Sequence, residues 1–483
     1  MERSQKGGAW KMPRRDFLRT LGTGAAGMAL GSKGLLATAS AGEATRKRKG
    51  IATVRGAFLY PSTESLRKVG YYSWPGSGFD AEGHHRMYAK EIEKIARKVG
   101  MRIGMDEKPL YEAESVTRFI NDVKERKPDG LLLIPFKKSE WASIVRIVKE
   151  TRIPTVTLAT IGVLLNPHIN QLYREPGVYV ISSLDNFDAI ESGMRMIRAT
   201  RWMKESRLIS LAGAESRKMT VPNLGTQVVA FPRKRFAEEF GHIETTDAVQ
   251  DLARAYLKNA RKVVEPSESE VVDAAKTYFV CKRILEAEEG DAIMMDCLGG
   301  IRQRTFPPPC MGFMSLRDEG IASGCQNDLN PTLTMMLVQE LFDRPGFQQN
   351  ASSETEANHY FGAHCTSPTK LSGTSGPSEP YILRNHAEAG VGVVPQVLWR
   401  EGQETTMALY LSGKEPQMIV YTGKVVRCYD MPPAGGCRTN VEMTINEVDD
   451  VCDVKGMHQI IFYGNYVKQL RAFCQLYRIN VVT

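Results

Sequence analysis

Cysteine is missing from the first 280 residues of this 483-residue chain, and all nine cysteines lie in the remainder. No two of them form a CxxC pair, and an odd number scattered through apolar stretches does not match a disulfide framework. This distribution excludes a small disulfide-stapled protein and predicts buried structural thiols. The length and a hydrophobic content of 42% are sufficient for two to three domains with real cores.

Signals for nucleotides and nucleic acids are also scarce. Residues 51–158 alternate between strand and helix patterns, yet this βαβ series lacks a glycine-rich dinucleotide fingerprint and a Walker loop. The chain has no basic helix interleaved with aromatic residues and no zinc-ligand spacing. We therefore expect neither a nucleotide cofactor nor a nucleic-acid partner.

The N-terminal segment carries most of the excess positive charge. It contains the twin-arginine pattern RRDF at residues 14–17, followed by a weakly apolar stretch and the small-residue cleavage pattern ASA at residues 39–41. Residues 1–41 hold +5 of the formal +8, which leaves +3 for the rest of the chain. Five glycines and a lysine make residues 20–41 too polar to span a bilayer well.

These features predict a twin-arginine signal peptide over residues 1–41 and a basic tether over residues 42–50. The mature protein is then exported by the twin-arginine pathway to the periplasm, or otherwise outside the cytoplasmic membrane. We expect no membrane span in the mature protein.

Two α/β units follow the tether. In residues 51–177, Gly100 can end a predicted helix whose apolar face runs from Tyr88 to Val99, and a near-continuous apolar run at 131–135 is typical of a parallel strand covered on both faces. Residues 178–371 repeat the pattern, with strands expected near 178–182, 208–212 and 292–295. The predicted fold class is α/β, with two doubly wound, Rossmann-like layers.

The pattern changes after residue 371. Residues 372–380 are rich in Gly, Ser, Thr and Pro and form a predicted linker. From residue 381 onward, short segments of period two lie between turns, which indicates antiparallel hairpins. We predict an antiparallel β-barrel domain over residues 372–483, ending in a strand, a helix and a strand.

The densest group of polar residues lies between residues 320 and 371, at the expected ends of two strands that flank a helix. Asn330–Pro331 has the form of the helix start, with the asparagine as N-cap. A strand, a helix and a strand with polar groups at both strand ends is how an open α/β sheet builds a site. The residues concerned are Gln326 and Asp328 after the first strand, Gln348, Gln349 and Asn350 before the second, and His364 and Cys365 at its far end.

Four segments in this order resemble one known family. They are GCQNDLNPTLTMML at 324–337, GFQQN at 346–350, GAHCTSP at 362–368 and GMHQIIFYGNYVKQLRAFCQLYRINVV at 456–482. Together they are similar to the L-fucose and L-arabinose isomerase family, over a region from about Val178 to the C-terminus. The resemblance implies aldose–ketose isomerisation, a Greek-key barrel in the C-terminal domain, and a homo-oligomer, trimeric or hexameric, that completes its sites across subunits.

In that family two carboxylates and one histidine hold a manganese ion, and a further histidine lies close by. By resemblance the carboxylate positions fall on Gln326 and Gln349, with Asn350 as the neighbouring choice, while His364 and His458 are kept. An amide cannot remove the C–H proton, and manganese prefers carboxylate and water oxygens. We therefore expect Mn²⁺ or another divalent cation to bind weakly.

Two interpretations of different class follow. In the first, an exported protein binds a small carbohydrate, a sugar or polyol, in the family pocket between the second α/β unit and the barrel, with ordinary manganese-dependent isomerisation absent or feeble. In the alternative, an active isomerase uses displaced acids, Asp328 and Glu354, and a metal held by His364 and His458. The candidate residues are Gln326, Gln349 and Asp328 for catalysis, Trp74, Asn350 and Cys365 for ligand contacts, and His364 and His458 for any metal.

Several of these candidates also have a plainer interpretation. Trp74, in the aromatic loop 71–76, could stack on a sugar face or simply pack. Cys365 alone is more typical of a buried small hydrophobe than of a nucleophile. His364 and His458, which lie 94 positions apart, would without the resemblance be ordinary packed or surface histidines.

Overall fold

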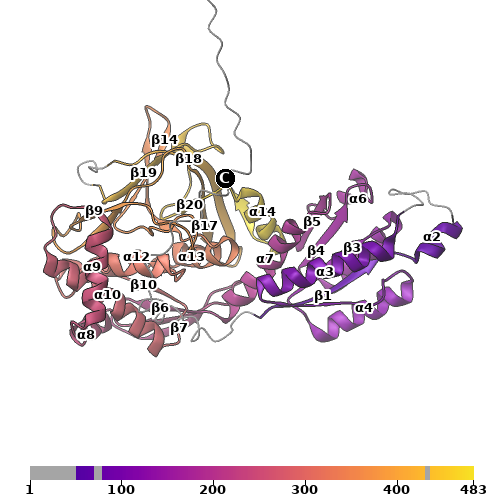
Figure 1. Ribbon diagram of the computed structural model, residues 1–483, viewed down its shortest axis with the longest axis horizontal. Coiled ribbons are helices and arrows are strands. Elements are labelled where there is room, and N and C mark those ends of the chain that lie inside the picture. The colour runs from indigo at the N-terminus through magenta and orange to yellow at the C-terminus, as the bar shows by residue number, and fades with distance from the viewer. Residues whose placement is uncertain (1–50, 70–78, 430–435) are drawn as a thin grey trace, which may run out of the picture. The chain divides into compact units, whose positions relative to one another are not determined.

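The computed structural model describes residues 51–69, 79–429 and 436–483, which belong to one compact unit. The predicted signal peptide (1–41), the predicted tether (42–50) and Trp74 lie outside these residues. Within them, no helix combines the length and the apolar character needed to cross a membrane. The architecture is mixed α/β, as expected, with parallel and antiparallel sheets (Figure 1).

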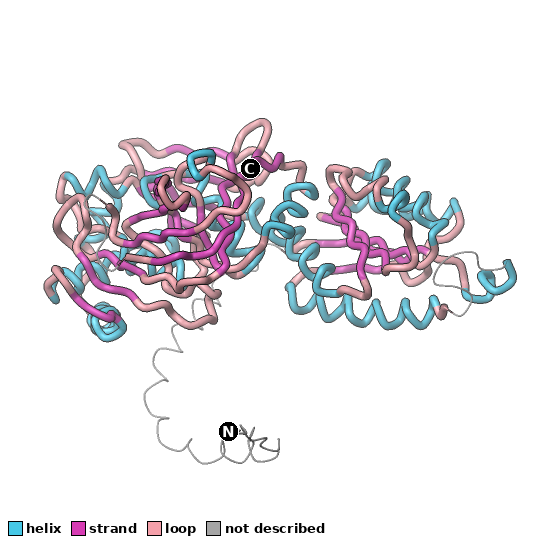
Figure 2. The backbone as a smooth tube through the Cα atoms, turned by 90° about the horizontal axis from the view of Figure 1, so that it is seen from above, coloured by secondary structure: helices cyan, strands magenta, loops and turns pink. Residues whose placement is uncertain are grey.

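The first sheet has five parallel strands in the order β2-β1-β3-β4-β5, which is a doubly wound arrangement. Its elements are β1 (Thr53–Leu59), α2 (Thr63–Val69), α3 (Ala81–Val99), β2 (Arg102–Met105), α4 (Ala113–Arg126), β3 (Gly130–Pro135), α5 (Trp141–Thr151), β4 (Thr155–Thr160), α6 (Asn166–Ile169), β5 (Val178–Ser183) and α7 (Phe187–Glu205). Successive β3 residues alternate between the two faces: Leu131 and Leu133 join a cluster with α4 and α5, and Leu132 and Ile134 join one with α3 and α7. Helices therefore lie on both sides of these strands (Figure 2).

The helix before β2 ends as the sequence predicted. Gly100 follows α3 in the left-handed conformation, with φ of 74°, and its N–H donates to the carbonyl of Ala96. Glycine has no Cβ to clash in this conformation, so it ends a helix without strain.

The sequence prediction assigned the strand near residues 178–182 to the second α/β unit, and this is wrong. Strand β5 pairs with β4 from Thr155↔Val178 to Thr160↔Ser183 and completes the first sheet. Its inward residues, Val178 and Val180, bury against the cluster beneath α4 and α5. An apolar strand pattern records burial but not the identity of the neighbouring strand.

The second sheet has the order β11-β10-β6-β8-β7, and it is parallel except for the edge strand β7. Its elements and helices are β6 (Arg207–Leu211), β7 (Arg217–Thr220), β8 (Gln227–Phe231), α8 (Lys234–Gly241), α9 (Asp247–Asn259), α10 (Glu268–Ala287), β10 (Ala292–Met295), α11 (Cys297–Arg302), α12 (Cys310–Asp318), β11 (Ser323–Gly324) and α13 (Leu329–Phe342). On one face of this sheet, Leu208 and Met294 belong to a hydrophobic cluster with residues of α7 and α13. On the other face, Ile209 and Ile293 belong to a cluster with residues of α10.

The remaining strands are mainly antiparallel. An eight-stranded sheet has the order β12-β20-β17-β18-β19-β14-β13, with β21 paired in parallel to β18. A three-stranded sheet has the order β16-β15-β9. The elements are β9 (Ala260–Val263), β12 (Phe347–Gln348), β13 (Asn350–Glu354), β14 (His359–His364), β15 (Tyr381–Arg384), β16 (Val394–Val397), β17 (Glu404–Leu411), β18 (Gln417–Arg427), β19 (Thr439–Met443), β20 (Ile460–Tyr463), α14 (Val467–Leu476) and β21 (Asn480–Val482).

Helix α13 is enclosed between the second sheet and the eight-stranded sheet (Figure 1). Leu333 and Leu337 share a cluster with Met294 of β10 and with Ala408 of β17, and the Tyr410 N–H donates to Thr334 Oγ1 at 2.8 Å. All residues from 331 to 338 are buried, so this helix is apolar on every side rather than amphipathic. It brings its N-terminal end, at Asp328, to the antiparallel sheet.

The C-terminal half corrects two sequence predictions. Strand β14 pairs antiparallel with β19 from Tyr360↔Met443 to His364↔Thr439, so the second strand of the expected open α/β site belongs to the antiparallel sheet instead. Residues 417–427 form one strand of 11 residues, where the sequence predicts only short segments. The predicted strand, helix and strand at the C-terminus are confirmed as β20, α14 and β21. Among the described strands the hydrogen-bonded path of the eight-stranded sheet does not close into a barrel.

A buried carboxylate stabilises the β14–β19–β18 region. Glu442 is 2% exposed and accepts from His359 Nδ1 and Arg427 Nε at 2.7 Å and from the Tyr429 hydroxyl at 2.8 Å. Burial by itself raises its pKa, but these three hydrogen bonds outweigh burial and hold the pKa at about 2.

Glu442→Gln should lower the free energy of unfolding by about 2 kcal/mol at pH 7. The folded pKa lies below the unfolded one, so this stability is present above about pH 4.5 and is lost as the pH falls towards 2. Urea unfolding of wild type and variant between pH 7 and 3 measures the difference, which should shrink on acidification. Glu356→Gln, at an exposed position of the turn between β13 and β14, is the control. A difference that stays constant with pH would contradict the assignment.

Candidate functional site

Asp328 and His458 meet at the beginning of α13. The helix begins at Leu329, so Asp328 and not the predicted Asn330 occupies the N-cap position. The Asp328 side chain caps no backbone N–H, because its Oδ2 lies 2.8 Å from His458 Nδ1. Asn330 instead accepts from the N–H and hydroxyl of Ser412, at 3.2 and 2.9 Å.

His364 lies beside His458. His364 ends β14, His458 immediately precedes Gln459 and β20, and their ring centroids are 5.6 Å apart at an interplanar angle of 75°. Both side chains are buried, with 2% and 4% exposed. Within the described part of the chain, neither ring nitrogen of His364 has a hydrogen-bond partner, nor does Nε2 of His458. Buried polar atoms are normally paired, so these three ring nitrogens are available to a further partner.

The surroundings of His364 keep it neutral. Burial lowers its pKa to about 3, and the positive charges that His458, Arg317 and His386 carry or can carry add to the effect. Burial also lowers the pKa of His386. At neutral pH, His364 therefore presents a nitrogen lone pair that can accept a hydrogen bond or bind a metal.

The two amides at the positions where the resemblance implies acids have different environments. Gln326 is half-buried in a 3-10 turn (Cys325–Asn327), and both it and Asn327 have left-handed backbones, with φ of 57° and 54°. Left-handed conformations cost energy for residues other than glycine and gather at functional sites. The neighbouring Gln348 holds this turn, since its Oε1 accepts from the N–H of Cys325 and its Nε2 donates to the carbonyl of the same residue.

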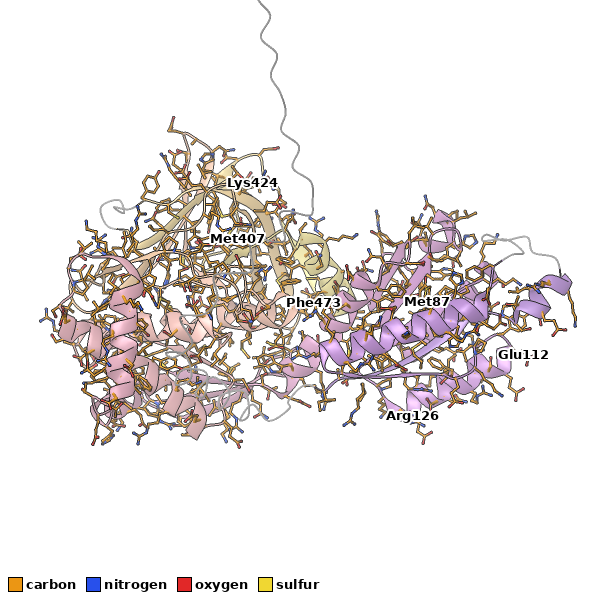
Figure 3. All side chains as sticks on the ribbon, in the orientation of Figure 1. Met87, Glu112, Arg126, Met407, Lys424 and Phe473 are labelled. Carbon is orange, nitrogen blue, oxygen red and sulfur yellow. The ribbon has the colours of Figure 1, made fainter. Side chains whose placement is uncertain are left out.

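Gln349 is fully buried and bonded at both ends. Its Oε1 accepts from the Tyr360 hydroxyl at 2.9 Å, and its Nε2 donates to the Gln459 carbonyl at 3.4 Å and to Gln459 Oε1 at 3.3 Å. Nε2 also contacts the sulfur of Met407, which lies among the strands of the eight-stranded sheet (Figure 3). The side chain covers Gly362, two positions from His364 on the same face of β14.

Other predicted candidates lie elsewhere. Asn350 pairs with Ala363, so alternation places it on the face of the sheet opposite His364 and Gln349. Glu354 lies at the other end of β13, roughly 17 Å along the strand from Gln349 at ~3.4 Å per residue. Its carboxylate accepts from the N–H of Ala357 in the hairpin turn. The structure therefore does not bring Glu354 to the histidine pair.

Cys365 also turns away from the pair. Its Sγ lies 3.7 Å from Cys437 Sγ, in a small cluster with Cys310 and Val394. All nine cysteines are free thiols, and six of them are buried, in agreement with the sequence prediction.

A pocket of about 380 Å³ opens between the start of α13 and the eight-stranded sheet. Its polar lining residues are Asp328, Asn330, Gln417 and Lys455, and its apolar ones are Pro331, Leu409, Leu411, Ile419, Met457 and Val482. Among the described residues that line this pocket, Asp328 is the only one with a carboxylate, and it also contacts His458. The histidine pair therefore lies behind the wall of the pocket and is linked to it by Asp328.

Two residues important to this geometry, Arg317 and Lys455, carried no signal in the sequence, whereas Gln348 belonged to the predicted polar group. Arg317 is buried and donates to the carbonyls of Ser323 and Thr366, so it connects the segment before Gln326 to the segment after His364. Gln348 clamps the turn, and Lys455 lines the pocket. No spacing rule identifies such residues, because their partners are distant in sequence.

The donors present do not fit manganese. In the part of the chain that the structure describes, no three or more His, Cys, Asp or Glu side chains are grouped so as to hold a metal ion. His364 and His458 offer two imidazoles as metal ligands. Asp328 Oδ2 already accepts from His458, and both the oxygen and the nitrogen of the Gln349 amide are hydrogen-bonded to other residues. Imidazole suits zinc, copper or nickel better than manganese. In metal sites, the histidine nitrogen that does not bind the metal usually donates to a carboxylate. Asp328 contacts Nδ1 of His458 in this way, so the lone pair of Nε2 is available to a metal ion.

We compared the sequence with known proteins. No protein-family model matches the chain, and no curated protein matches it.

Proposed function

We propose that this protein binds a small polyhydroxylated molecule, a sugar or a polyol, in the pocket beside Asp328, and that manganese-dependent isomerisation is absent or feeble. One observation carries the proposal. Asp328, His364 and His458 come from three separate segments of the chain that resemble L-fucose and L-arabinose isomerases, and they lie together, with His458 contacting both of the others.

The pocket lining suits such a ligand. Asp328, Asn330 and Gln417 offer polar groups to hydroxyls, while Leu409, Ile419 and Val482 provide an apolar wall for the C–H face of a sugar. Lys455 Nζ donates to the carbonyl of Thr483, which holds its ammonium group at the rim. A ligand with hydroxyls on one side and carbon on the other matches this lining.

The chemistry argues against ordinary turnover. Aldose–ketose isomerisation needs a base beside the substrate C–H and usually a Lewis acid for its oxygens. The amides Gln326 and Gln349 cannot act as bases, and Gln349 is fixed between Tyr360 and Gln459. Loss of a general base costs about a hundredfold to ten-thousandfold in rate.

A second candidate is an isomerase that uses a displaced acid. The contact of Asp328 with His458 favours it, because a carboxylate and an imidazole in contact can exchange protons with a ligand. Of the two displaced acids considered from the sequence, only Asp328 remains in this candidate, since Glu354 lies in the distant hairpin.

Three further features belong to the same proposal. The eight-stranded sheet is assigned as the family's Greek-key barrel, supported by its end strands β12 and β13, which are separated only by Gln349. A trimer or hexamer is proposed from the resemblance. Export by the twin-arginine pathway is proposed from residues 1–41.

The proposal predicts binding that depends on Asp328. Calorimetric titration of the mature chain with a panel of aldoses, ketoses and polyols should yield at least one ligand, and Asp328→Asn should weaken its binding about tenfold to a hundredfold, because a hydrogen bond to a charge is lost. Asp251→Asn, at an exposed position of α9, is the matched control.

Two results would count against the proposal. No binding to any member of the panel, or equal affinity in the Asp328→Asn variant, would remove the ligand site. Ketose formation should also be assayed with and without added manganese. Fast manganese-dependent turnover by the unmodified protein would favour the displaced-acid isomerase instead.

A further inference from the structure

Two thiols lie within reach of each other at the end of the β14–β19 ladder. Cys365 follows His364, the last residue of β14, and Cys437 lies two residues before Thr439, which pairs with His364. Their sulfur atoms are 3.7 Å apart, so formation of a disulfide of about 2.05 Å requires movement of less than 2 Å. They are 72 positions apart in the sequence, and both are free thiols in the structure.

The two thiols differ in access and reactivity. Cys365 is 7% exposed, whereas Cys437 is half-buried. The hydrogen bond between them lowers the pKa of Cys437 and raises the pKa of Cys365, and burial raises the latter further. A thiolate is the attacking species in exchange, so Cys437 is suited to attack first and Cys365 to resolve.

We propose that Cys365 and Cys437 are a redox-active pair that forms a reversible disulfide by exchange with a small disulfide of the glutathione type. The Cys437 thiolate attacks one sulfur of the small disulfide, and one small thiolate leaves and takes up a proton. Cys365, losing its proton, attacks the Cys437 sulfur of the mixed disulfide and releases the second small thiol. Two protein thiols are oxidised and one small disulfide is reduced to two thiols.

A disulfide between Cys365 and Cys437 would stabilise the fold because of where the two residues lie. The disulfide would cross-link the end of β14, directly after His364, to the segment that leads into β19. Cross-linking restricts the unfolded chain over a long loop, so it should raise the melting temperature. The proposal stands independently of the ligand site, because it needs only the two thiols and the strand pairing.

The mature chain should be equilibrated with oxidised or with reduced glutathione, then unfolded and its free thiols counted. Oxidation should lower the count from nine to seven, and peptide mass spectrometry should find Cys365 joined to Cys437. Reduced glutathione should restore nine. A count that stays at nine, or a link from Cys437 to Cys310, would overturn the pair.

Variants separate the two roles. Cys365→Ala should leave one stable glutathione adduct on Cys437, because the resolving thiol is missing, whereas Cys452→Ser, which removes the exposed cysteine, should still form the cross-link. An unmodified Cys437 in the Cys365→Ala protein would contradict its role as attacking thiol. If that variant fails to fold, the wild-type peptide map alone decides whether the bond forms.

Discussion

Replacing Arg317 by methionine should lower the free energy of unfolding by about 4 kcal/mol. Arg317 is 2% exposed, and its guanidinium donates to the Ser323 carbonyl at 2.6 and 3.0 Å and to the Thr366 carbonyl at 3.1 Å. It also donates to the Ser323 hydroxyl and to Cys325 Sγ. Methionine fills a similar volume but leaves both carbonyls buried without a partner.

Two terms oppose each other in this substitution. Removing a buried charge relieves a desolvation cost, which can make an apolar replacement neutral. Two buried carbonyls left without a hydrogen-bond partner, however, cost about 1–3 kcal/mol each. Because the bonds of Arg317 hold both Cys325, beside Gln326, and Thr366, near His364, we expect the second term to dominate and ligand affinity to fall as well.

Chemical denaturation measures this effect, and Arg302→Met provides the control. Arg302 is on α11, its side chain is 73% exposed, and its ion pair with Glu388 is long, at 3.6 Å. Exposed ion pairs contribute about 0–1 kcal/mol, so this control should change stability little. Equal stability of the Arg317→Met variant and the wild type would mean that the two carbonyls find other partners.

Substituting Gln349 by glutamate should cost about 3 kcal/mol, although the resemblance places a carboxylate at this position. The Nε2 donor would become an oxygen facing the carbonyl and Oε1 of Gln459, and only Tyr360 could still donate to the new group. A carboxylate buried without a cation or enough donors is expensive. The amide is therefore part of a hydrogen-bonded core and is not simply a neutralised acid.

Gln326, the other position where the resemblance implies a carboxylate, provides the matched comparison. Gln326→Glu places the same charge on a half-buried side chain in the turn after β11, so it should change stability by less than about 1 kcal/mol. Unfolding of both single variants in denaturant, without and with added divalent metal, tests the contrast. Equal costs for the two variants would show that burial does not decide the effect, and a metal-dependent gain in Gln349→Glu alone would indicate that the site can be rebuilt.

Local sequence patterns determined the elements and their order. Hydrophobic periodicity located β3, β6 and β10, glycine marked the end of α3, and the change to period two marked the antiparallel segments. These properties depend on neighbours within a few residues, through side-chain burial and backbone conformation. The order of helices and strands could therefore be predicted without tertiary information.

Tertiary structure alone decided which strands pair and which side chains meet. Strand β5 joined the first sheet and β14 joined β19, although both have ordinary apolar patterns. Asp328 reached His458 across 130 positions, whereas Glu354, the candidate carboxylate nearer to Gln349 in sequence, stayed in its hairpin. A strand pattern specifies a buried face but not its partner, and a hydrogen bond between distant residues depends on how whole elements pack; neither is encoded in the spacing of nearby residues.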